Sequence, residues 1–298
     1  MSHLIAAVDG YDLLGYRAAV GATGFEAQAA VRSILRGFGP VDVGAGLHLP
    51  RYEITTAAKG WQLQVDGSVV QEDADLPPAL GALEWYVVAT ALSKRNDLFQ
   101  LHGAALCLPT ERAGIVLVGD SGSGKTTLAL ALMMRGFVPF SDDVALINPE
   151  TLELQTLRRA FHVSDDTRRL VKPLTFGLLG SDDDPHGYFS PPQWAGQAAP
   201  VRWLLFVEHH PQRAPQLVPL TAPQAATAIL AQALNLSRAP RLAVATTARL
   251  VERCSIYRFL TSDIEASVAM LQQQLSFYSS SGQVSRTQHD SRPRPPQV

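Results

Sequence analysis

The sequence has few cysteines, little net charge and no long apolar run, and each shortage argues against a class of protein. Cys107 and Cys254 are its only cysteines, and they lie too far apart to form a metal-binding or redox motif. We therefore expect a reduced, cytoplasmic chain. The formal net charge is −2, so we expect neither a nucleic-acid partner nor attraction to an anionic membrane.

Membrane and export segments are also missing from the pattern. No apolar run approaches the roughly 18 residues that span a bilayer. The first residues, MSHLIAAVDGYD, lack a basic segment and soon reach Asp9 and Asp12, so we expect no signal peptide. Hydrophobic residues make up 46% and charged residues 17% of the chain, which is enough to build the core of one or two globular domains.

The hydrophobic pattern divides the chain into three parts. Residues 1–95 combine a helical pattern over 24–39, strand-like alternation that turns near Gly60 and Asp66, and a buried-helix pattern over 76–95. They predict a small α+β module, a candidate for substrate recognition. Residues 278–298 are rich in Ser, Arg and Pro, which predicts a disordered tail.

Residues 96–277 show the sequence pattern of an α/β domain. Two apolar runs, FQLHGAALCLP and GIVLVGD, precede a glycine-rich loop and a helical segment. The later runs VALIN, LELQTL and VRWLLFVE predict further strands, and helices are expected after Thr221 and after Ser262 or Asp263. Strands that alternate with helices in this way predict an α/β fold.

The glycine-rich loop has the spacing of a phosphate-binding (Walker A) loop. Residues 119–126 read G-x-x-x-x-G-K-T. Glycines let successive N–H groups turn toward a phosphate, and the helix that follows points its positive end at the same anion. Such a match arises by chance in about one chain in a hundred, but the strand before it and the helix after it favour nucleotide binding. The predicted nucleotide-binding residues are Gly119, Asp120, Ser121, Gly122, Ser123, Gly124, Lys125, Thr126 and Thr127.

Two adjacent aspartates follow at a distance that brings them back to this loop. A helix from Thr126 to Arg135 rises about 15 Å, and a strand from Phe137 to Asp142 returns about 17 Å. Asp142 and Asp143 should therefore lie level with the γ-phosphate, at the carboxyl end of the neighbouring strand. There the pair can accept a proton from a hydroxyl and support Mg²⁺. The alternative is a solvated strand end.

Other candidates are less distinctive. Glu208 ends an apolar strand and could polarise water, as in an ATPase, but a core strand running into the polar turn of His209 and His210 explains the same pattern. His102 is either a hydrogen-bonded strand residue or an imidazole beside the phosphates. Spacing alone does not decide between these alternatives.

The segments LHGAAL, GDSGSGKTTLALALMMRG and FSDDVALI resemble the catalytic domain of HPr kinase/phosphorylase. They are still more similar to HPr-kinase-related proteins found beside peptide-tailoring genes, including lasso-peptide kinases. The resemblance covers about residues 99–275. It implies that residues 96–277 form a P-loop kinase domain with a fold like the nucleotide domain of phosphoenolpyruvate carboxykinase. It also implies ATP- and Mg²⁺-dependent transfer to a serine of a peptide or small protein, by a homo-oligomeric enzyme.

The resemblance also implies roles for single residues. Asp142 matches the general base, Asp143 the second acid, here assigned to the metal, and His102 the active-site histidine. Arg159, in LRRAFH, resembles an arginine that follows the next strand in the related kinases.

Lys125 and Thr126 match the loop residues. We expect Lys125 to be a catalytic residue that neutralises charge on the phosphates, and Thr126 to be the second metal ligand. The Glu-, Arg- and Gly-rich motif associated with phosphorolysis is not recognisable, and residues 1–95 do not match the sensor domain of the bifunctional enzyme. A small-metabolite kinase and a catalytically silent nucleotide-binding partner of a biosynthetic enzyme are the alternatives.

Overall fold

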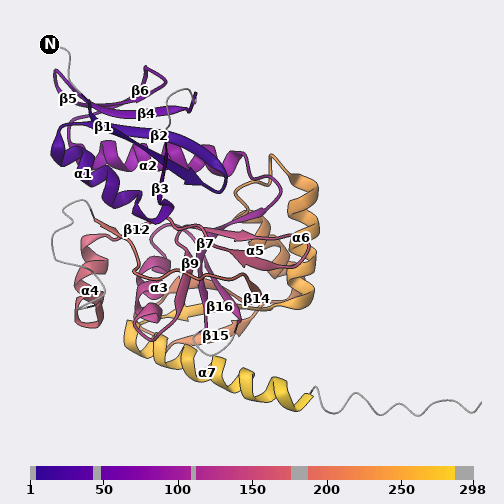
Figure 1. The fold of residues 1–298 in the computed structure, drawn as a ribbon. Coiled ribbons are helices and arrows are strands. Elements are labelled where there is room, and N and C mark those ends of the chain that lie inside the picture. Colours follow the sequence, from indigo (N-terminus) through magenta and orange to yellow (C-terminus); the bar gives the residue numbers. More distant parts are fainter. Residues whose placement is uncertain (1–4, 43–47, 109–111, 176–186, 286–298) are drawn as a thin grey trace, which may run out of the picture.

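Two β-sheets with helices between and around them make up the α/β fold of the chain (Figure 1). The computed structural model describes residues 5–42, 48–108, 112–175 and 187–285. None of the helices within these ranges has the length and apolar character that a membrane crossing requires.

The first sheet has six strands in the order β3-β1-β2-β4-β5-β6. Its last three strands form the predicted antiparallel meander. The chain turns at Gly60 and at Asp66–Gly67, where the positive φ angles of 49° and 78° suit a tight hairpin turn. The strands are β1 (Ile5–Leu13), β2 (Tyr16–Thr23), β3 (Pro40–Val41), β4 (Arg51–Ala57), β5 (Gly60–Val65) and β6 (Ser68–Asp73).

The two helices predicted in this part of the chain are both present. Helix α1 (Phe25–Ile34) and helix α2 (Leu76–Ser93) share one hydrophobic core with the first sheet. The same core includes Val144 and Leu146 of the second sheet, so α2 lies between the two sheets, as Figure 1 shows. The chain enters the second sheet at Phe99, close to the predicted domain boundary at residue 95, which stays a prediction.

The second sheet has eight strands in the order β11-β10-β7-β8-β14-β16-β15, with β9 also paired to β7. Only the β8–β14 and β14–β16 pairs are parallel. Strand β11 pairs with both β10 and β14. The strands are β7 (Phe99–Cys107), β8 (Gly114–Val118), β9 (Val138–Ser141), β10 (Val144–Ile147), β11 (Glu153–Gln155), β14 (Ala199–His209), β15 (Gln216–Pro219) and β16 (Ser255–Thr261), while β12 (Phe161–His162) and β13 (Tyr188–Phe189) form a separate ribbon.

Helices cover both faces of the second sheet. Helix α3 (Lys125–Met133) and helix α7 (Ile264–Ser285) pack on one face, and α4 (Asp165–Thr175) lies beside α3. Helices α5 (Ala222–Ala231) and α6 (Pro240–Arg253) pack on the other face. The predicted start of α5 is confirmed by a capping box, in which the Thr221 N–H donates to Gln224 Oε1 at 3.0 Å.

Helix α7 continues beyond the predicted start of the tail. Residues 278–285, expected to be disordered, belong to this helix, and residues 286–298 of the expected tail lie outside the described residues. Extending an existing helix costs far less than nucleating one, so a helix can continue past the apolar residues that define it in the sequence.

Candidate functional site around the glycine loop

The glycine loop joins the buried strand β8 to helix α3. Gly119, Gly122 and Gly124 have φ angles of 152°, 80° and 93°, which residues with side chains rarely adopt. A Cβ on Gly119 would also lie only 2.9 Å from the Val207 carbonyl oxygen. The predicted strand–loop–helix arrangement is therefore present, and the first turn of α3 opens toward the loop.

The side chain of Lys125 is held inside this loop. Its Nζ donates to the carbonyl oxygens of Gly119 at 2.8 Å and of Asp120 at 2.9 Å. The residue is 6% exposed, and burial lowers its pKa while the nearby carboxylates oppose that shift.

Asp142 and Asp143 lie at a kink between two strands. Strands β9 and β10 both pair with β7, and the two aspartates interrupt what would otherwise be one long strand. Asp143 has a φ of 60°, a left-handed conformation that aspartate tolerates better than most residues. The expected position on the strand next to β8 was wrong, because β7 forms a hairpin with β8 and occupies that place.

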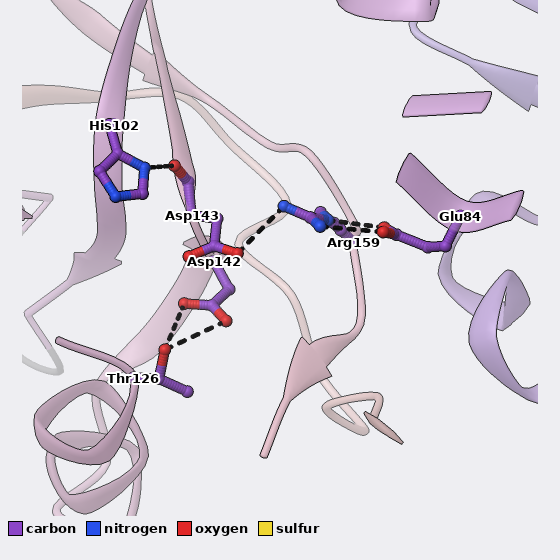
Figure 2. A network of polar contacts seen from close by, with 6 residues as sticks. All are labelled: Glu84, His102, Thr126, Asp142, Asp143 and Arg159. Atoms are coloured by element: carbon purple, nitrogen blue, oxygen red, sulfur yellow. Dashed lines mark hydrogen bonds and ion pairs between the residues drawn. The ribbon is translucent and has the colours of Figure 1, made fainter. Parts of the chain in front are cut away.

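The expected return of the chain to the glycine loop is nevertheless observed for Asp142, while its level relative to a γ-phosphate stays a prediction. The Thr126 hydroxyl donates to Asp142 Oδ1 at 3.3 Å and lies 3.5 Å from Oδ2 (Figure 2). Asp142 is 2% exposed, so it is not a solvated strand end. Burial, followed by the charge of Asp143, raises the pKa of Asp142 to about 7.

His102 on β7 lies beside the kink. Its Nδ1 donates to the Asp143 carbonyl oxygen at 3.1 Å, and the Gly103 N–H donates to the same oxygen at 3.0 Å. Burial, with the charge of Lys125, lowers the pKa of His102, which favours the neutral ring at pH 7. A neutral ring that donates from Nδ1 leaves Nε2 free to accept a proton or hydrogen bond.

Arg159 connects this kink to the first part of the chain, a connection that the sequence pattern did not predict. Its Nε and Nη2 donate to the two carboxylate oxygens of Glu84 on α2 at 2.6 and 2.9 Å, and its Nη1 donates to Asp143 Oδ2 at 3.2 Å (Figure 2). Although burial opposes it, the charge of Glu84 raises the pKa of Arg159. Glu84 is 2% exposed. It is the only charged residue in the apolar helix LPPALGALEWYVVATALS, and that was the available signal.

Two cavities meet at His102 and Asp143. The larger, about 610 Å³, is lined by loop residues 121–127 and by His209. The smaller, about 440 Å³, is lined by Trp85, Arg159 and residues 231–234. His102 and Asp143 line both cavities, and the larger cavity also reaches the glycine loop. The sequence predicted this neighbourhood for the aspartates but left the position of His102 open.

The competing carboxylate has other partners. Glu208 pairs with Arg258 at 3.0 Å and lies 3.5 Å from His210, and it lines neither of these two cavities. Only His209 of that predicted group reaches the larger cavity.

The oxygen ligands beside the loop fit magnesium. Among the described residues, no three His, Cys, Asp or Glu side chains form a cluster that could hold a metal by themselves. Mg²⁺ bound to a nucleotide does not need such a cluster, because phosphate oxygens and water supply most of its ligands. The hydroxyl of Thr126 and the adjacent carboxylate of Asp142 are hard oxygen donors of the kind that Mg²⁺ prefers.

Comparison with known proteins adds no name to this arrangement. No family model matches the chain, and no curated protein matches it.

Proposed function

We propose that the chain is an ATP- and Mg²⁺-dependent kinase of the HPr-kinase-like type, with a P-loop domain that transfers the γ-phosphoryl group to a serine hydroxyl of a peptide or small protein. The observation that carries this proposal is the 3.3 Å contact between the Thr126 hydroxyl and the buried Asp142 carboxylate, beside the loop that encloses Lys125. Loop, cation and oxygen ligands together are what phosphoryl transfer requires.

The loop side of the site binds and orients the donor. Backbone N–H groups of the loop and the N-terminus of α3 hold the phosphates, and Lys125 exchanges its two carbonyl partners for phosphate oxygens. Thr126 and Asp142 would hold the Mg²⁺ ion that accompanies the nucleotide. When bound, Mg²⁺ would neutralise part of the negative charge on the phosphates.

The proton of the acceptor goes to Asp143 in this proposal. Asp143 lines both cavities, whereas Asp142 is buried against Thr126. The acceptor oxygen forms a bond to the γ-phosphorus as the bond from phosphorus to the bridging oxygen breaks, ADP leaves, and the hydroxyl proton passes to the Asp143 carboxylate. His102 presents its neutral Nε2 to the same space. These roles reverse the division implied by the family resemblance, in which Asp142 is the base and Asp143 serves the metal.

A water-activating ATPase is a weaker reading of the same site, because Glu208 is paired with Arg258 and lines neither cavity. The other implications of the resemblance, a homo-oligomer and a cytoplasmic location, stay predictions.

The proposal is tested with ATP labelled on the γ-phosphate, Mg²⁺ and a mixture of short peptides that carry one serine at varied sequence positions. We expect label on peptide serine, no transfer when EDTA removes the metal, and none to the matched alanine mixture. Release of all label as inorganic phosphate would identify an ATPase. If calorimetry detected no Mg²⁺-dependent ATP binding, the nucleotide site itself would be refuted.

A further inference from the structure

We propose that the smaller cavity is the acceptor subsite, and that it takes an uncharged apolar side chain adjacent to the reacting hydroxyl of a peptide. This inference rests on the proposed kinase function and adds to it a substrate preference and the residues that set it, Trp85 and Leu234.

The position of the cavity suits an acceptor. It reaches His102 and Asp143, but the loop residues that would hold the nucleotide line the larger cavity instead. Gln232 contacts residues of both the acceptor side and the loop side. Its carbonyl oxygen accepts from the backbone N–H of His102 at 2.8 Å, and its Nε2 donates to Asp120 Oδ1 at 2.9 Å. In-line transfer needs the acceptor and the leaving group on opposite sides of the γ-phosphorus. The smaller cavity supplies the side away from the loop.

The charges around the cavity argue against an anionic acceptor. The guanidinium of Arg159 is bound by both oxygens of Glu84 and by Asp143 Oδ2. Two carboxylates thus face one cation. A carboxylate or phosphate on the acceptor would find no uncompensated positive charge here, and it would lose its hydration on entry.

The apolar part of the lining supplies the attraction. Trp85 and Leu234 are 51% and 39% exposed, and both stand among the few large apolar side chains of the described residues that remain exposed. Apolar and aromatic side chains that line a concave site are typical of ligand pockets. Trp85 also lies with its ring 5.8 Å below the Arg159 guanidinium, which fixes its orientation.

The size of the cavity fits a short peptide segment. A volume of about 440 Å³ lies within the range of pockets that bind small ligands. One aliphatic or aromatic side chain packed between Trp85 and Leu234 would place its neighbouring serine at Asp143. Because Trp85 belongs to α2, the first part of the chain would select the substrate on which the second part acts.

Three blocked peptides test this subsite: acetyl-Ala-Ser-Phe-amide, acetyl-Ala-Ser-Gly-amide and acetyl-Ala-Ser-Glu-amide. We expect kcat/KM for the phenylalanine peptide to exceed the other two by about ten-fold or more. Trp85→Ala and Leu234→Ala should each reduce this preference while the affinity for ATP and Mg²⁺ stays unchanged. Leu234→Ala is the second variant because Leu234 has no ring under Arg159. Phe25→Ala, which removes an aromatic side chain that is 87% exposed and lines neither cavity, should keep the preference.

A binding measurement separates failure of the subsite from failure of the kinase. A 4-fluorophenylalanine version of the first peptide is titrated by fluorine NMR in the presence of a non-hydrolysable ATP analogue and Mg²⁺. Binding that both cavity variants weaken, without any transfer, would support the subsite and refute the kinase. Transfer with the same preference in all variants would support the kinase and overturn the subsite. Absence of peptide binding, or preference for the glutamate peptide, would also overturn the subsite.

Discussion

The two sheets differ in how visibly they contribute to the candidate site. The second sheet supplies the glycine loop, His102 and the aspartate kink from one short stretch of sequence, and most of their geometry follows from backbone conformation. Beside the first sheet, helix α2 places Glu84 and Trp85 against Arg159. A site shaped by backbone leaves a motif in the sequence. A contact between single side chains far apart in the chain leaves almost none.

The glycine loop and the Glu84–Arg159 ion pair also depend on different properties of their residues. The loop needs glycines at φ values that other residues avoid, so its chemistry is tied to residue type. The Glu84–Arg159 pair needs only two opposite charges that are buried together, away from solvent. Such a pair is costly to break because each partner would be left buried and uncompensated.

The largest expected effect separates the two aspartates of the second sheet. Asp143→Asn should reduce transfer by about a thousand-fold, because the amide cannot accept a proton at neutral pH. ATP affinity in Mg²⁺ should stay within a few-fold. Asp142→Asn should instead weaken the Mg²⁺-dependent part of ATP binding by about ten-fold or more, because the Thr126–Asp142 pair loses its charge. Calorimetric titration with a non-hydrolysable ATP analogue, with and without Mg²⁺, measures the second effect.

The opposite pattern in this pair would restore the roles implied by the family resemblance, with Asp142 as the base. Equal losses of metal-dependent affinity and equal residual transfer would make both residues a metal clamp. The base would then have to be sought elsewhere, with His102 next in line.

The next largest effect belongs to the loop. Lys125→Ala should reduce transfer by about a hundred-fold, since one preorganised charge contact to the phosphates is lost. The cooperative unfolding transition and the near-ultraviolet circular dichroism should persist. Lys59→Ala, in the exposed turn between β4 and β5, is the matched control and should change neither quantity. Normal turnover in Lys125→Ala would remove the loop from the mechanism.

The parts of this site that follow from sequence are those governed by local geometry. The lengths of a helix and a returning strand predicted that Asp142 would come back to the glycine loop, and its contact with Thr126 shows that it does. The glycine spacing predicted the loop, and the apolar periodicity predicted α2 and the meander. Each of these depends on neighbours in sequence, where periods and element lengths are informative.

The remaining parts depend on packing between distant segments. Periodicity does not specify that β7 lies between β8 and β9, because strand order is set by how the whole sheet closes. It does not reveal the kink at Asp143, since one left-handed aspartate has no pattern. The pairing of Glu84 with Arg159 was likewise invisible, although an isolated acid in an apolar helix is a usable signal that a buried cation lies nearby.

A smaller effect on transfer, with a clear effect on stability, is expected for the link between the two sheets. Glu84→Gln keeps the shape of the side chain but leaves the buried Arg159 with less compensation. The free energy of unfolding should fall by about 3–5 kcal/mol. Transfer should fall by about ten-fold through kcat, while KM for ATP stays unchanged because Glu84 does not line the larger cavity.

The double variant Glu84→Gln with Arg159→Gln is the control for this link. It removes both charges and should recover part of the stability without recovering transfer. We infer the ten-fold effect on transfer because Arg159, held by Glu84, donates to Asp143 Oδ2 and so positions that carboxylate. A proportional loss of kcat and ATP affinity in Glu84→Gln would indicate general loosening of the fold instead, and this positioning role would then be rejected.

The smallest effect is expected for an ion pair of the same geometry that lies in solvent. Arg32 donates to both oxygens of Asp9, from Nε at 2.7 Å and from Nη2 at 3.2 Å, as Arg159 does to Glu84. The Arg32 side chain, however, is 53% exposed, whereas that of Arg159 is 11% exposed. Water and salt screen the exposed pair, so Arg32→Gln should leave transfer and the melting temperature at pH 7 nearly unchanged.

The pH dependence of stability shows the contribution of the Arg32–Asp9 pair and its direction. The hydrogen bond from Arg32 holds the pKa of Asp9 below its ordinary value of 3.8. A carboxyl whose pKa is lower in the folded state stabilises the protein above 3.8, and this stabilisation disappears as the pH falls through the folded-state pKa. Without Arg32 the pKa of Asp9 is lowered less, so the Arg32→Gln variant should lose less stability than the unchanged chain between pH 4 and pH 2 in thermal scans. The difference should be small, because Gln28 still donates to Asp9 at 2.8 Å in both proteins. If Arg32→Gln cost as much stability at pH 7 as Glu84→Gln, geometry alone would decide the strength of these pairs, and burial would not be the reason that α2 is held against the site.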